Sequence, residues 1–125
     1  MKTTLLLVLL VLGLAPVRAG VLNSNTCVRI IVGEAAGEPY QCKLAIAAVL
    51  RNRGTTQGAY GGNAKHVKTE PKHVWTDARR AWNESLTNDP TGGCKHWGGN
   101  IDDHYFRDEL HWTPVLTIGH TSFYK

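Results

Sequence analysis

The N-terminus of this 125-residue chain places the strongest constraint on what it can fold into. A positive charge at Lys2 is followed by an almost wholly apolar run from Leu5 to Ala15 and then by small residues up to Gly20. This pattern is typical of a secretory signal cleaved after Ala19. A membrane anchor would need roughly 20 consecutive apolar residues, which this run does not reach. We therefore expect residues 1–19 to be a signal peptide and the mature chain to be secreted to the periplasm or cell wall, without stable membrane insertion.

The mature chain, residues 20–125, is long enough for one domain with a modest core and too short for two. Its formal charge falls from +4 to +2 because Lys2 and Arg18 leave with the signal. A mildly basic chain is attracted weakly to an anionic polymer such as cell wall. The Lys/Arg stripe of a nucleic-acid binder is absent. We expect a monomer that binds no nucleic acid.

Three cysteines remain after processing, namely Cys27, Cys42 and Cys94. Export places them where a disulfide can persist, and three thiols allow one internal bridge with one thiol left over. The spacing does not determine which pair forms. No C-x-x-C motif is present, and no two of the six histidines have the four-residue spacing of a helical zinc site. We therefore expect no metal and no cofactor, against the alternative of a His-rich secreted metalloprotein.

Apolar periodicity predicts a helical core. Asn25 or Thr26 could cap a first helix that carries several β-branched residues and is broken by Gly37. A second helix should begin around Pro39 and run through Arg53, where Gly54 stops it. A third helix is expected from Thr76 to Thr87, and its apolar face is formed by Trp75, Ala78, Trp82 and Leu86.

The remaining segments lack the apolar periodicity of a helix. Residues 55–71 are rich in Gly, Thr and Lys, which predicts a long exposed loop of the kind that is often functional. Residues 89–93 form a turn. The C-terminal third scatters aromatic residues among Gly, Asn, Asp and His, and short strands such as Val115 to Ile118 fit it better than another helix. The expected fold class is α+β, mainly α: a helical core with a small strand-and-loop lobe.

Glu34 is the residue with the clearest chemical potential. It lies between Gly33 and Ala35 at the end of the apolar first helix. Partial burial there would raise its carboxyl pKa, because desolvation disfavours the charged form. A carboxyl group that holds its proton near neutral pH can protonate a leaving glycosidic oxygen. The alternative from the residues alone is that Glu34 and Glu38 are ordinary exposed carboxylates at a helix end.

The string from Val32 to Tyr40, followed by Ala45 to Arg53, resembles the first signature of the cell-wall hydrolase family that includes spore cortex-lytic enzymes. Further matches follow in the family's order: Trp75, Asp89–Gly93, Trp112, Thr117–Gly119 and Phe123–Tyr124. The resemblance covers essentially the whole mature domain. The helix-pair signature is specific, whereas the later aromatic residues and glycines would be weak alone.

The resemblance implies that residues 20–125 form a lysozyme-like catalytic domain in which Glu34 is the acid and then the base of glycan cleavage. Related enzymes act as lytic transglycosylases: they cut peptidoglycan between N-acetylmuramic acid and N-acetylglucosamine and close the muramic 6-hydroxyl onto C1. One carboxylate suffices for that route. Hydrolysis by water would need a second carboxylate roughly 5 to 9.5 Å away, for which the candidates are Asp77, Asp102, Asp103 and Asp108.

Other predicted contacts with the glycan follow from the same resemblance. Glu38 matches the second glutamate, either capping the second helix or binding substrate. Asn52 could bond an acetamido group or the loop after Gly54, and Arg53 could pair with a carboxylate or serve the helix end. Trp75, Trp97 and Trp112 could each form a sugar platform or pack in the core, and we expect one or two of them to contact glycan, Trp97 above all. Tyr124 is expected as a further substrate contact.

Two departures from the family pattern affect these expectations. His120 follows Gly119 one place earlier than usual, and His73–Val74 replaces the usual Gln-Phe pair before Trp75. A different class of function is a peptidoglycan-binding module that keeps the groove without turnover. The intact Glu34 favours the enzyme over that module.

Overall fold

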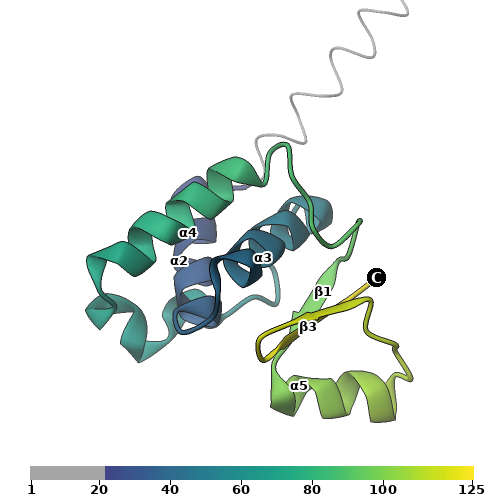
Figure 1. Cartoon of the computed structure of the whole chain (residues 1–125). Coiled ribbons are helices and arrows are strands. Elements are labelled where there is room, and N and C mark those ends of the chain that lie inside the picture. Colours follow the sequence, from purple (N-terminus) through teal and green to yellow (C-terminus); the bar gives the residue numbers. More distant parts are fainter. Residues whose placement is uncertain (1–21) are drawn as a thin grey trace, which may run out of the picture.

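A computed structural model describes residues 22–125, except for the side chains of Asn100 and Ile101. The predicted signal peptide, residues 1–19, lies outside the described residues. Three α-helices pack together, and a small three-stranded sheet with a further helical segment lies beside them (Figure 1). The predicted fold class, α+β and mainly α, is confirmed.

Helix α2 (Ser24–Ala35) begins one or two residues before the predicted caps. Asn23 is the cap, and its side-chain oxygen accepts a hydrogen bond from the Thr26 backbone N–H at 3.0 Å. Asn25 and Thr26 therefore lie inside the helix, and the prediction that one of them caps it is wrong. The β-branched residues predicted to be apolar contacts are buried in the core.

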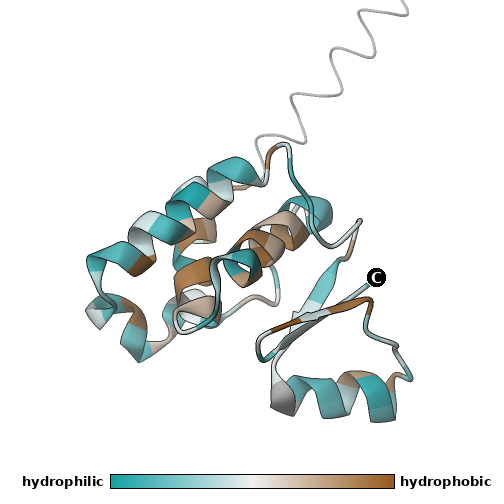
Figure 2. Ribbon diagram, viewed as in Figure 1, coloured by the Kyte–Doolittle hydropathy of each residue, from teal (hydrophilic) through white to brown (hydrophobic). Residues whose placement is uncertain are grey.

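Helix α3 (Tyr40–Arg53) is the central element, with every residue from Cys42 to Leu50 buried. Even the side chain of Lys43 is buried, with only 4% of the residue exposed, and its amine donates a hydrogen bond to the Glu38 carbonyl oxygen at 2.7 Å. The helix ends as predicted at Gly54, whose φ of 71° is left-handed and whose N–H donates to the Leu50 carbonyl. In Figure 2, hydrophobic residues occupy much of α3.

Helix α4 (Lys72–Glu84) begins four residues earlier than predicted, because Pro71 is extended and suits the position before a first turn. It also ends before Thr87, which leaves Leu86 69% exposed instead of on the apolar face. The preceding loop contains two short 3₁₀ turns, η1 (Gly61–Asn63) and η2 (Lys65–Thr69). Both turns contact α2, so the loop is more structured than its composition indicated.

The small lobe is an antiparallel sheet of order β1-β3-β2, formed by β1 (His96–Gly98), β2 (Leu116–Ile118) and β3 (Thr121–Tyr124). The central strand β3 is wholly buried. The strand expected at Val115–Ile118 is confirmed as β2. The expectation that this region holds no further helix is wrong, because α5 (Asn100–His104) continues into the π-helical turn η3 (Tyr105–Glu109).

All three cysteines are buried and free, so the one disulfide that the sequence allowed is not formed. Between residues 22 and 125, no helix is both long and apolar enough to cross a membrane.

Candidate active site

A cavity of about 250 Å³ opens where the helical core meets the small lobe. Glu34 contributes to it from the penultimate position of α2, and Arg53 from the last position of α3. The other lining residues come from the 55–71 loop, from β1 and from the α5–η3 segment: Gly58, Ala59, His96, Trp97, Asp102 and Phe106. Three of the predicted site residues, Glu34, Arg53 and Trp97, therefore meet in one cavity.

Two glycines bring the 55–71 loop against the catalytic candidate. A Cβ atom on Gly33 would lie 1.8 Å from the Gly61 carbonyl oxygen, so α2 and η1 touch through their backbones. A Cβ atom on Gly61 would lie 2.5 Å from Glu34 Oε1 and 2.6 Å from its Cγ. Only glycine at both positions allows this approach, which packs the η1 backbone directly against the Glu34 carboxyl group.

The environment of Glu34 favours its protonated form. The residue reaches the surface, but burial of its carboxyl group is the largest effect on its pKa and raises it. The negative charge of Asp102 raises the pKa further. Hydrogen bonding to the Trp97 side chain and the Gly61 backbone works in the opposite direction and is outweighed. The group is therefore poised to donate a proton at a higher pH than an ordinary glutamic acid.

Arg53 and Trp97 form the wall next to Glu34. The Arg53 guanidinium carbon lies 5.6 Å from the centroid of the Trp97 ring, within the range of a cation–π contact. Arg53 also donates a hydrogen bond to the Gln57 carbonyl, which ties the start of the 55–71 loop to α3. Both side chains remain partly exposed, so they can contact a ligand in the cavity.

Trp112 supports the cavity from behind instead of lining it. Its ring stacks on Phe106 with centroids 5.0 Å apart and planes 14° apart, and it lies 4.5 Å from His96. Phe106 and His96 both line the cavity. Tyr124 is 0% exposed and donates a hydrogen bond to Asp103 at 2.6 Å. The prediction that Tyr124 contacts substrate is therefore wrong, because its side chain has no accessible surface.

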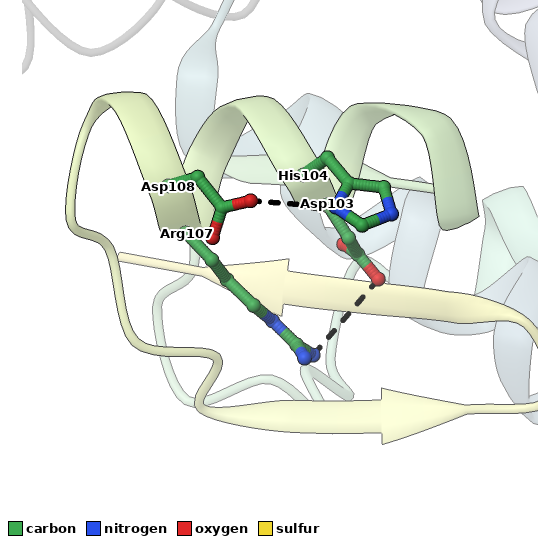
Figure 3. A pocket seen from close by; sticks show the side chains of 4 residues that line it. All are labelled: Asp103, His104, Arg107 and Asp108. Carbon is green, nitrogen blue, oxygen red and sulfur yellow. Dashed lines mark hydrogen bonds and ion pairs between the residues drawn. The ribbon is translucent and has the colours of Figure 1, made fainter.

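Asp103 fastens the α5–η3 segment to the sheet. Besides the Tyr124 hydroxyl, it accepts a hydrogen bond from Ser122 at 3.2 Å and lies 3.9 Å from Arg107. Figure 3 shows Asp103 and Arg107 with the exposed pair of His104 and Asp108, 3.4 Å apart, around a neighbouring hollow. Anchoring Asp103 on the sheet side leaves the adjacent Asp102 facing the Glu34 cavity.

Glu38 lies outside the cavity and holds the β2–β3 turn. Its carboxylate accepts hydrogen bonds from the His120 backbone N–H at 3.2 and 3.3 Å and contacts the His120 ring at 3.2 Å. Helix α3 has no side-chain cap, so the prediction that Glu38 caps it is wrong. The early position of His120 thus gives it a contact with Glu38.

Asn52 also serves the framework. Its amide nitrogen donates to Asp89 at 2.9 Å and to the Cys94 carbonyl at 3.0 Å, which uses both of its N–H groups. Asp89 in turn accepts from Thr91 and Gly93. Burial opposes ionisation of Asp89, but these hydrogen bonds outweigh it and hold its carboxyl pKa below the ordinary value. This network fixes the turn that leads into β1 and Trp97.

Several cavity residues were not predicted as site residues. Asp102 was only one of four possible second carboxylates, and no sequence signal marked His96 or Phe106 as a site residue. The predicted functional loop at 55–71 was the one pointer to Gly58 and Ala59, which line the cavity, and to Gly61, which packs against Glu34. No three His, Cys, Asp or Glu side chains within residues 22–125 gather closely enough to hold a metal ion.

No protein-family model and no curated protein matches the sequence. Two solved structures are similar. The catalytic domain of the germination-specific lytic transglycosylase SleB from Bacillus anthracis has a TM-score of 0.63 at 21% identity, over 82% of this chain and 93% of that one. The catalytic domain of the Bacillus cereus SleB protein has a TM-score of 0.55 at 22% identity, over 82% and 88%. The predicted resemblance to spore cortex-lytic enzymes is thus confirmed for the fold.

Proposed function

We propose that this chain is a secreted peptidoglycan-cleaving enzyme, a lytic transglycosylase that uses Glu34 as general acid and then base. The observation that carries the proposal is the position of Glu34 in a cavity beside Trp97, with burial raising its carboxyl pKa. The shared fold with two SleB catalytic domains supports the same reaction class. The mature chain would act as a monomer in the periplasm or cell wall, on the glycan strand of peptidoglycan.

The reaction requires one proton donor at the glycosidic bond. Protonated Glu34 gives its proton to the oxygen between N-acetylmuramic acid and N-acetylglucosamine, and the C1–O bond of the muramic residue breaks. The muramic 6-hydroxyl then bonds to C1 and returns its proton to the Glu34 carboxylate, which closes an anhydro ring. Protons balance, and the enzyme ends in its starting state.

The cavity walls offer suitable substrate contacts. Trp97 presents a partly exposed indole, on which the flat C–H face of a sugar ring can stack. The Arg53 guanidinium can pair with a carboxylate of the muramic substituent. Asp102 lies in the same cavity and could instead activate a water molecule, which would give hydrolysis. The products distinguish the two routes.

The test is incubation of the mature chain and its Glu34→Gln variant with purified sacculi. The wild type should release muropeptides and the variant should not, although both should bind the sacculi in a pull-down. Release by both proteins would remove Glu34 as the acid, and binding without release by the wild type would indicate a non-catalytic module. Mass spectrometry should find muropeptides that end in an anhydro ring, which are lighter by one water than the products of hydrolysis. Muropeptides with ordinary reducing ends would show hydrolysis.

A further inference from the structure

A second hollow lies on the outward face of α4. Its volume is about 440 Å³, larger than the cavity at Glu34. Successive turns of one helix line it, with the residues Lys72, Trp75, Thr76, Arg79, Arg80 and Asn83. In Figure 1, α3 lies between α4 and the sheet, so this groove belongs to a different face of the molecule from the lobe that carries Trp97.

The groove has three basic side chains, of which Arg80 has an acidic neighbour and Lys72 and Arg79 have none among the described residues. Lys72 and Arg79 are exposed, and neither has an ion-pair partner within residues 22–125. Arg80 is held in place, because its guanidinium lies 4.1 Å from the Tyr40 ring centroid and 4.0 Å from Asp77. Arg79 lies seven positions after Lys72, which corresponds to about 10 Å along the helix. Two free cations therefore face outward with room for two separate anions.

Trp75 gives the same groove an aromatic floor. It is half-buried, with one side packed against the hydrophobic core and the remainder open to the hollow. The Thr76 hydroxyl bonds to the Lys72 carbonyl at 3.1 Å, whereas the Asn83 amide is exposed at the far end. An aromatic face between two cations suits sugar rings that carry acidic substituents, because the rings can stack while the acids pair with Lys72 and Arg79.

We propose that the α4 groove is a second binding site for peptidoglycan, taking a strand that is not being cleaved through its sugar rings and carboxylates. The inference rests on the proposed function for its choice of polymer. Charge complementarity favours this occupant: peptidoglycan has spaced carboxylates, and the groove has two spaced cations instead of the continuous basic stripe that nucleic acid requires. Attachment at α4 raises the local concentration of substrate at the Glu34 cavity.

The test measures binding, separately from turnover. In a Glu34→Gln background, the pair Lys72→Gln and Arg79→Gln is compared with Lys65→Gln and Lys68→Gln. The control pair makes the same charge change at exposed lysines of η2. Cosedimentation uses purified sacculi stripped of phosphodiester polymers, at low and high salt. Trp75 stays unchanged, because it packs against the core.

We expect the α4 pair to weaken sacculus binding roughly two- to tenfold and to reduce its salt dependence, beyond the effect of the control pair. Equal binding by the two pairs overturns the inference. It is also overturned if the α4 pair loses affinity for a phosphodiester polymer or double-stranded DNA while sacculus binding stays unchanged. A wild type that binds through α4 but releases no muropeptides would defeat only the proposed function.

Discussion

The backbone of Gly61 lies directly against the side chain of Glu34, and a Cβ atom on Gly61 would come within 2.5 Å of Oε1. Gly61→Ala must therefore displace the carboxyl group. Because a shift of about 1 Å at a catalytic group can cost on the order of 100-fold, we expect muropeptide release to fall by about 10- to 100-fold while the fold is kept. Circular dichroism and a release assay check this.

Gly37→Ala is the matched control, because nothing lies within 4 Å of a Cβ atom there. It should change neither folding nor release. Equal activity of the Gly61→Ala and wild-type chains would mean that the carboxyl position is not critical.

Asp102→Asn should move the pH dependence of activity. The Asp102 charge raises the pKa of Glu34, so its removal lowers that pKa, and Glu34 then loses its proton at a lower pH. We expect the alkaline limb of the release profile to shift to lower pH, and an NMR titration of the Glu34 carboxyl carbon to shift in the same direction. Asp108→Asn, in the neighbouring hollow, should leave both unchanged. A shift of equal size in both variants would contradict a specific effect of the Asp102 charge on Glu34.

Glu38→Ala should destabilise the chain, because it removes the hydrogen-bond acceptor of the His120 N–H and with it the contact that holds the β2–β3 turn. The expected loss in the free energy of unfolding is about 1 to 3 kcal/mol. His120→Ala keeps the backbone contact and removes only an exposed ring, so its loss should stay below about 1 kcal/mol. Denaturant unfolding measures both. A larger loss from His120→Ala would show that the contact between the His120 ring and Glu38, and not the hydrogen bond from the His120 backbone N–H, holds the turn.

The helical core was predictable because its signals are local. The apolar steps of α3 and the left-handed Gly54 are properties of adjacent residues, and they gave the correct end of that helix. The α5–η3 segment gave no such signal, since it is polar and depends on Gly98. A Cβ atom there would lie 2.7 Å from both Asp102 Cβ and the Phe106 ring, so α5 can dock only against a glycine.

The site was predictable only in part, because most of its contacts join residues that are far apart in the sequence. Glu34 was identified from a motif within the chain. The contact of Glu38 with His120 joins residues 82 positions apart, and the approach of Gly61 to Glu34 depends on a loop without periodicity. Tyr124 matched a family aromatic residue, but its burial follows from its central strand.

Asn52 and Asp89 should be energetically coupled, because Asn52 donates to both Asp89 and the Cys94 carbonyl. A double-mutant cycle with Asn52→Ala and Asp89→Asn should give a coupling of about 0.5 to 3 kcal/mol. Hydrogen bonds hold the Asp89 pKa below its ordinary value, so its stabilising effect is present above that value and lost as pH falls through the lowered one. The deficit of Asp89→Asn should therefore shrink in acid. Additive losses would contradict the network.

The three thiols should be inert in the folded chain although the predicted compartment is oxidising. Burial raises the pKa of Cys27 to about 11, against the opposing charge of Arg51, and burial also raises the pKa of Cys42 and Cys94. Since the thiolate is the reactive form, an aromatic disulfide reagent should label none of them before unfolding and all three in denaturant.

A Cys27→Ser variant calibrates the labelling. It should take two labels in denaturant, one fewer than the wild type, and no label in the native state. A reductant should not change the melting temperature of the wild type, since no bridge constrains its unfolded chain. Fewer than three labels in denaturant without reductant would mean that two of these thiols are bridged. Prompt labelling of the native chain would mean that the core around α3 opens far more readily than its packing implies.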